Sequence, residues 1–178
     1  VFFFFLLSLI YSLSVCAQSH SHSHDHIHAG LHHWEIPSKD PDRIILTFNG
    51  DPSTTRAVTW RTDSSVVKAE AQIAVAGKNS TFERNAKTYI ANTEEFDLGI
   101  YKSNKSLIVH YHSLIFENLN PNTLYVYRVG YGENWSEWIQ FKTANNNYSP
   151  TEFVYFGDAQ NDILNHWSRV IRMAYQTA

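Results

Sequence analysis

The chain has 178 residues, of which 43% are hydrophobic and 17% are charged. This balance is typical of a folded protein with one or two domains and excludes a chain that is disordered throughout. The 14 basic and 17 acidic residues give a formal net charge of -3, without the clustered basic surface of a nucleic-acid-binding protein, so we expect no nucleic-acid partner.

An uncharged apolar run, rich in Phe and Leu, occupies residues 1–15 and is followed closely by the small residue Ala17. It is shorter than the roughly 20 residues needed to span a bilayer. The run predicts a secretory signal at residues 1–17, cleaved after Ala17. We therefore expect a secreted or periplasmic protein without a transmembrane segment after cleavage. Because neither an initiator Met nor a basic segment precedes the run, we expect the sequence to begin inside the signal.

The single cysteine, Cys16, lies within this segment. Cleavage after Ala17 would leave a mature chain without a disulfide, stabilised by packing and by any bound metal. The alternative is a lipoprotein anchored through Cys16. Val15 argues against it, since this side chain is bulkier than the small residue expected before a lipidated cysteine.

A low-complexity tract follows within residues 18–40, which we interpret as a His-rich linker. Neutral imidazoles can bind zinc, copper or nickel, but a flexible repeat presents no fixed geometry. We expect a solvated tether, with loose metal binding as the alternative. Seven of the ten histidines lie in the tract: His20, His22, His24, His26, His28, His32 and His33.

Short β-rich runs alternate with turn residues across residues 41–144, as in a β-sandwich. Residues 80–101 have no clear pattern and suit either a further strand or a long loop. The expected strands are residues 44–48, 57–61, 69–75, 107–116, 124–129 and 138–141.

The segment from Leu119 to Tyr125 contains a Pro-containing turn that leads into a strand. It resembles the corner of fibronectin type III domains, in which a tyrosine hydroxyl bonds to the backbone of the corner. The resemblance implies that Tyr125 is tied to this turn and that Trp60 is the core aromatic residue of the facing sheet. The pattern specifies an architecture and says little about activity, because sandwich modules have many functions.

A polar, turn-forming stretch at residues 145–150 predicts a domain boundary. The apolar run at residues 153–156 then predicts a buried strand, and Gly157 allows a sharp turn after it. Asp158 would place a hard oxygen ligand at the carboxyl end of this strand, where open α/β sheets bind their ligands. Asp158 is therefore the candidate metal ligand.

A helix capped by Asp162 is expected next, so that residues 150–178 form the first half of a βαβ unit. His166 lies at the edge of the apolar face of this helix, and we expect a surface or packing residue there rather than a ligand. The apolar face comprises Ile163, Leu164, Trp167, Val170, Ile171 and Ala174.

A fibronectin-like module followed directly by Phe156-Gly157-Asp158 resembles the purple acid phosphatases of the metallophosphoesterase superfamily. The resemblance covers about residues 41–178 and includes the stretches 49–62, 119–130 and 141–144. It implies a mostly β chain: a fibronectin type III-like β-sandwich at residues 41–144, followed by the first strand and helix of a truncated α/β metallophosphoesterase domain at residues 150–178. Gln160 stands where the family more often has Gly, and the remaining motifs are expected beyond Ala178.

The resemblance further implies hydrolysis of phosphate monoesters at a dinuclear metal centre of iron with iron, zinc or manganese. Asp158 matches the residue that ligates one of the two metals. Two cations can neutralise phosphoryl oxygens and lower the pKa of a bound water. This stretch of chain, with one ligand and no assigned catalytic residue, is expected to be inactive by itself. The alternative for Asp158 is a carboxylate that caps a turn or a helix.

Two other functions compete with this one: an extracellular fibronectin-like binding module with a His-rich metal-binding tail, and a metal scavenger built around the histidine tract. The binding module does not explain an amphipathic helix that lacks a sheet to cover it. The scavenger explains the tract alone. The sequence assigns no oligomeric state and no physiological substrate.

Overall fold

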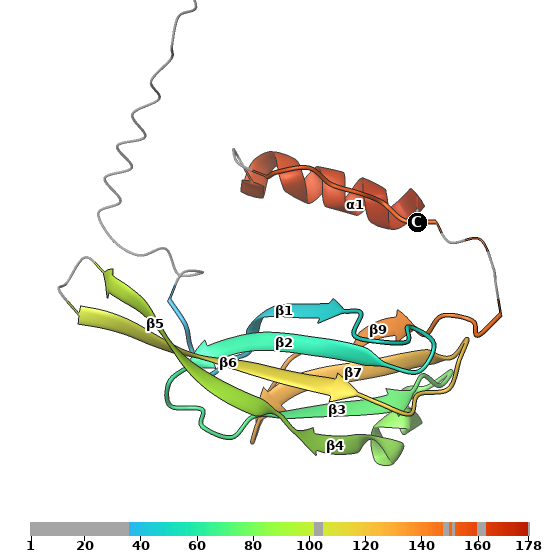
Figure 1. Cartoon of the computed structure of the whole chain (residues 1–178), viewed down its shortest axis with the longest axis horizontal. Helices are drawn as coiled ribbons and strands as arrows, with labels where there is room; N and C mark the ends of the chain where they lie inside the picture. The colour runs from blue at the N-terminus through green and yellow to red at the C-terminus, as the bar shows by residue number, and fades with distance from the viewer. Residues whose placement is uncertain (1–35, 102–104, 148–149, 151, 160–162, 178) are drawn as a thin grey trace, which may run out of the picture. The chain divides into compact units, whose positions relative to one another are not determined.

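The computed structural model describes residues 36–101, 105–147, 150, 152–159 and 163–177, and Figure 1 shows their arrangement. The expected signal, Cys16 and the histidine tract lie outside these residues, as does Asp162. Among the helices of the described part, none is long and apolar enough to cross a membrane.

Two antiparallel sheets form the folded body (Figure 1). The first sheet has the order β1-β2-β6-β5. Its strands are β1 (Asp42–Thr47), β2 (Arg56–Asp63), β5 (Asn92–Tyr101) and β6 (Lys105–Phe116).

The second sheet has the order β4-β3-β7-β8, and β9 also pairs with β7. The chain crosses from one sheet to the other between β2 and β3, between β4 and β5 and between β6 and β7, as in immunoglobulin-like sandwiches. The strands are β3 (Glu70–Val75), β4 (Lys87–Ile90), β7 (Leu124–Tyr131), β8 (Asn134–Trp135) and β9 (Ile139–Lys142).

The six expected strands are confirmed, with boundaries that differ by at most two residues. The unassigned stretch at 80–101 contains a 3-10 helix, η1 (Ser80–Asn85), and strands β4 and β5. Both strands lie at sheet edges, and every residue of β4 is exposed. An edge strand with little burial lacks the apolar alternation by which a strand is identified in a sequence.

The core lies between the two sheets, where side chains from β2, β6 and β7 meet. Trp60 is 0% exposed, which confirms it as the core aromatic residue of its sheet. Phe116 packs edge-on against Tyr127 from the opposite sheet, with ring centroids 6.1 Å apart. Burial of such aromatic surface is the main stabilising contribution expected in a sandwich without a disulfide.

Arg128 on β7 contacts two indoles, those of Trp135 on β8 and of Trp138 just before β9. Its guanidinium carbon is 4.6 Å from the ring centroids of both Trp135 and Trp138, and its Nε donates to Gln72 Oε1 at 2.8 Å. On the same strand, a Cβ at Gly130 would come within 2.2 Å of the backbone oxygen of Asn134 on β8. The close approach of β7 and β8 therefore requires glycine at this position.

The expected buried strand at residues 153–156 is wrong, because residues 152–159 form no strand and Phe153 and Tyr155 are 83% and 85% exposed. A strand needs a neighbour to pair its backbone groups, and none of the described strands supplies one here. The expected helix is present as a π-helical turn, η2 (Ile163–Trp167), and α1 (Ser168–Thr177). The apolar side chains Val170 and Ile171 are exposed.

Candidate functional site

Asp158, the candidate metal ligand, lies in the extended segment between the sandwich and the helices. The residue is exposed, as is Gly157 before it. Two residues before Asp158, Phe156 packs edge-on against Trp167 at the end of η2, with ring centroids 5.8 Å apart. Asp158 is thus a hard oxygen ligand on a solvent-exposed residue.

The described residues contain no group of three or more His, Cys, Asp or Glu side chains that could hold a metal ion, either around Asp158 or elsewhere. His166, which we expected to be no ligand, is exposed on η2. A dinuclear centre needs several ligands. Asp158 is the one ligand predicted among the described residues, and its role stays a prediction.

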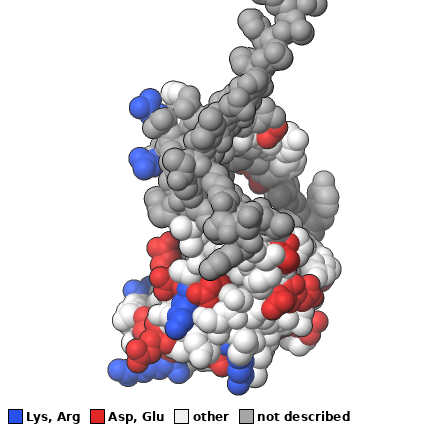
Figure 2. All heavy atoms as spheres, turned by 90° about the vertical axis from the view of Figure 1, so that its left-hand side faces the viewer, with Lys and Arg blue, Asp and Glu red and all other residues white. Residues whose placement is uncertain are grey.

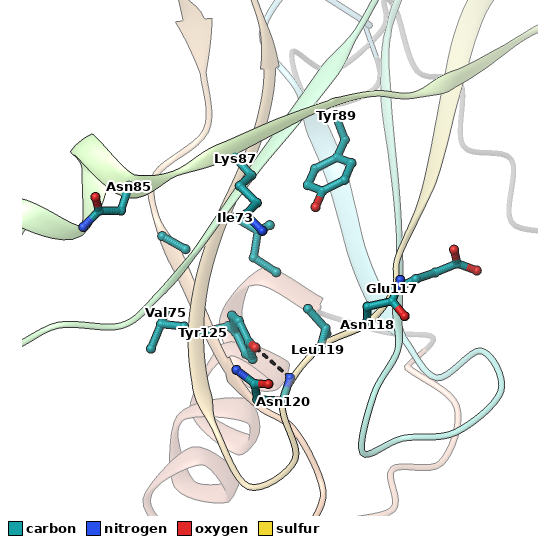
Figure 3. A pocket seen from close by; sticks show the side chains of 11 residues that line it. Ile73, Val75, Asn85, Lys87, Tyr89, Glu117, Asn118, Leu119, Asn120 and Tyr125 are labelled. Atoms are coloured by element: carbon teal, nitrogen blue, oxygen red, sulfur yellow. Dashed lines mark hydrogen bonds between the residues drawn. The ribbon is translucent and has the colours of Figure 1, made fainter.

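The expected tyrosine corner is present (Figure 3). The Tyr125 hydroxyl accepts a hydrogen bond of 2.8 Å from the backbone N–H of Asn120. Thr143 adds a second tie, since its Oγ1 donates to the Asn120 carbonyl at 2.7 Å and accepts from the Thr123 N–H at 2.9 Å. These bonds fix the turn before β7 against the end of β9.

An open cavity of about 430 Å³ adjoins this corner. Figure 3 shows Lys87 and Tyr89 of β4 on one side and Glu117, Asn118 and Leu119 on the other. One ammonium, one phenol and one carboxylate could bind a small polar molecule. Among the described residues that line the cavity, no nucleophile is paired with a base and no group of metal ligands is present, so we assign it no catalytic role.

A buried pair of histidines on β6 was not singled out in the sequence. His112 Nε2 lies 2.8 Å from Thr62 Oγ1, and His112 Nδ1 lies 2.9 Å from Thr93 Oγ1. Burial, followed by the neighbouring His110, lowers the pKa of His112 from its usual 6.5 to about 4. The period-two alternation from Leu107 to Phe116 could have shown that both imidazoles share a face with Phe116.

His110 lies edge-on to His112, with ring centroids 6.2 Å apart. Its Nδ1 lies 2.8 Å from the Val66 carbonyl oxygen, and its Nε2 lies 3.7 Å from Glu95 Oε2. Both imidazoles are thus held by hydroxyls and backbone inside the sandwich. With no open position for a substrate, this pair is a structural network.

The surface of the sandwich carries both signs of charge. Figure 2 shows acidic and basic side chains interspersed on the face that it presents, in keeping with the net charge of -3. On this face the described residues form no continuous basic stripe.

The two-sheet order and the tyrosine corner define a β-sandwich of the fibronectin type III class. A family model described as "Purple acid Phosphatase, N-terminal domain" matches residues 41–143. The chain belongs to this family. The match confirms the resemblance drawn from the sequence.

Solved structures with a similar fold include animal proteins. The FN1-FN3 domains of chicken CNTN1 are 18% identical with a TM-score of 0.40, and the match covers 61% of this chain and 31% of that one. The fn3 domain of human contactin 1 is 19% identical with a TM-score of 0.42, covering 65% and 86%. Astrotactin-2 is 15% identical with a TM-score of 0.41, covering 62% and 22%. No curated protein matches this chain.

Proposed function

We propose that this chain is the N-terminal part of an exported, metal-dependent phosphatase that hydrolyses phosphate monoesters. The observation that carries the proposal is the order of two features. A purple acid phosphatase N-terminal domain at residues 41–143 is followed directly by Phe156-Gly157-Asp158. A carboxylate after a short apolar run is the first ligand expected of the metallophosphoesterase domain.

Asp158 would hold one metal of a dinuclear centre of iron with iron, zinc or manganese. Its exposed carboxylate fits this role, because a hard oxygen ligand suits such ions. The bound pair of cations would supply charge neutralisation of the phosphoryl group and a water of lowered pKa. The residue's own part is to fix the position of its metal and to balance one positive charge.

The exposed apolar residues around Asp158 support a second domain. Phe153 and Tyr155 precede it, and Val170 and Ile171 lie on α1, all with much of their side chains in solvent. Apolar groups on one strand-length run and one helix face are what a βαβ unit buries when further strands pair with it. We propose that this segment opens the catalytic domain.

Export is part of the proposal and depends on the predicted secretory signal at residues 1–17. Mass spectrometry of the mature protein should find Gln18 as the first residue. A mature chain that begins at a lipid-modified Cys16 would instead indicate a membrane-anchored lipoprotein.

The test of Asp158 uses the full-length protein purified with its metals. Asp158→Asn keeps the size of the side chain and removes its charge, so we expect loss of bound metal and a fall in turnover of an aryl phosphate by about 100-fold or more. The matched control is Glu152→Gln, which removes an exposed carboxylate from the same segment. The control should keep wild-type metal content and turnover.

Metal content is measured by elemental analysis and folding by the melting temperature of the sandwich. Near-normal turnover and metal in Asp158→Asn would refute the assignment of this ligand. A wild-type full-length protein that binds metal but hydrolyses no phosphate ester would favour the extracellular binding module instead.

A further inference from the structure

The chain contains four acceptor motifs for N-linked glycans, in which Asn is followed two residues later by Ser or Thr with no Pro between. They begin at Asn79, Asn104, Asn134 and Asn147. Asn104 lies outside the described residues, as do the two residues that complete the motif of Asn147. The other two motifs can be compared in full.

Asn79 lies in the loop between β3 and η1, where residues 77–81 are all exposed. Its side-chain Oδ1 accepts a hydrogen bond of 3.3 Å from the Thr81 N–H and a second, of 2.5 Å, from the Thr81 hydroxyl. These contacts direct the Oδ1 of the amide back toward the turn. They involve only the motif itself, so the same turn can form before the sandwich does.

Asn134 presents its motif in a different way. The residue is half-buried in β8 and pairs with Tyr131 across the hairpin. The hydroxyl of Ser136 is engaged elsewhere, since it accepts from the Val129 N–H at 3.1 Å and donates to the Glu137 carbonyl at 2.9 Å. Both of these hydrogen bonds of the Ser136 hydroxyl are to backbone groups outside Asn134, unlike the bond that the Thr81 hydroxyl donates to Asn79.

Bulk is a further difference between the two positions. The backbone oxygen of Asn134 lies close against Gly130, and the next residue, Trp135, packs on Arg128. A glycan here would emerge from a tight strand pair beside an aromatic stack. At Asn79 the surrounding loop is open to solvent, and a glycan would displace no packed side chain.

We propose that Asn79 is an N-glycosylation site and that Asn134 is not, an inference that rests on the proposed export of the protein. The donor would be an oligosaccharide linked to a lipid diphosphate, supplied by a glycosylating secretory pathway. The Asn79 Nδ2 forms a bond to C1 of the sugar as the bond from C1 to the diphosphate oxygen breaks. The diphosphate leaves with the electron pair, and one Nδ2 proton passes to a base of the transferase.

The test expresses the full-length protein in a glycosylating eukaryotic host and maps the secreted product by mass spectrometry. A glycosidase that converts each glycosylated Asn to Asp reports the occupancy of each site. We expect Asn79 to be occupied and Asn134 to be bare. Asn79→Gln and Thr81→Val should each remove one glycan. Thr81→Ser should retain the glycan on Asn79, and Asn134→Gln should leave the number of glycans unchanged.

Three outcomes would overturn the inference, and they separate it from the proposed function. Secreted, active phosphatase with a bare Asn79 contradicts the glycan alone. Occupancy of Asn134 with a bare Asn79 refutes the structural argument for choosing between the motifs. Retention in the cytosol with residues 1–17 uncleaved refutes export and, with it, the glycan. Because Asn79→Gln and Thr81→Val alter different side chains, loss of the same glycan in both supports the inference even if one variant is poorly secreted.

Discussion

The Tyr125 hydroxyl accepts a hydrogen bond of 2.8 Å from the backbone N–H of Asn120. This bond joins the start of β7 to the turn before it, and the Tyr125 ring stacks on Phe141 of β9 with centroids 5.7 Å apart. The corner therefore ties a turn and two strands through one buried side chain.

We expect Tyr125→Phe to lower the free energy of unfolding by about 1 kcal/mol, because it removes this hydrogen bond while keeping the stacked ring. Urea denaturation measures the change. The control is Tyr131→Phe, which removes an exposed phenol from the same strand. Equal midpoints for both variants would show that the corner bond contributes nothing to stability.

Trp60 offers a test of the core. Trp60→Ala should cost about 3 to 5 kcal/mol by leaving a large cavity, a substantial part of the 5 to 15 kcal/mol typical of a domain. Trp60→Phe should cost less, since it keeps an aromatic ring and removes the indole Nε1, a buried donor without an acceptor among the described residues. Thermal melts that rank the two variants in the opposite order would contradict this packing.

His112 should make the sandwich less stable in acid. Its folded pKa, lowered by burial to about 4, lies below the usual 6.5. Folding therefore favours the neutral imidazole, and above pH 6.5 the protonation of His112 costs the folded protein no stability. As the pH falls from about 6.5 to about 4, the unfolded chain takes up a proton that the folded chain does not. The free energy of unfolding should fall by up to about 3 kcal/mol across this window.

Urea denaturation at a series of pH values across this window measures the effect. His112→Gln keeps a polar side chain near the hydroxyls of Thr62 and Thr93 but cannot titrate. We expect the variant to be less stable at pH 8 and to have a shallower dependence on pH. Parallel pH profiles for the wild type and the variant would show that His112 does not cause the loss of stability in acid.

Asp42 supports a buried charge. Arg61 is fully buried, and its Nε and Nη2 donate to the two carboxylate oxygens of Asp42 at 2.8 and 2.5 Å. Asp42→Ala should cost about 2 to 3 kcal/mol, because the guanidinium loses two charge-assisted bonds. Asp40→Ala removes a neighbouring exposed carboxylate and should be nearly neutral. A loss of similar size in both variants, measured by urea denaturation, would indicate an effect of net charge rather than of this pair.

The sequence alone determined the features that depend on local pattern. Alternating apolar residues located six strands, and the Pro-containing turn before β7 predicted the hydrogen-bonded tyrosine. The resemblance of this turn to the corner of fibronectin type III domains also implied the burial of Trp60. In each case the information lies within a few neighbouring residues, whose spacing sets which face of a strand they occupy.

Only the tertiary structure decided the features that depend on partners distant in the chain. The edge strands β4 and β5 exist because β3 and β6 pair with them, and the His112 network draws hydroxyls from β2 and β5. The run at residues 153–156 has the composition of a buried strand but forms none, since no described strand pairs with it. Backbone pairing and burial are supplied by the neighbours of a segment, and its own residues set only the preference.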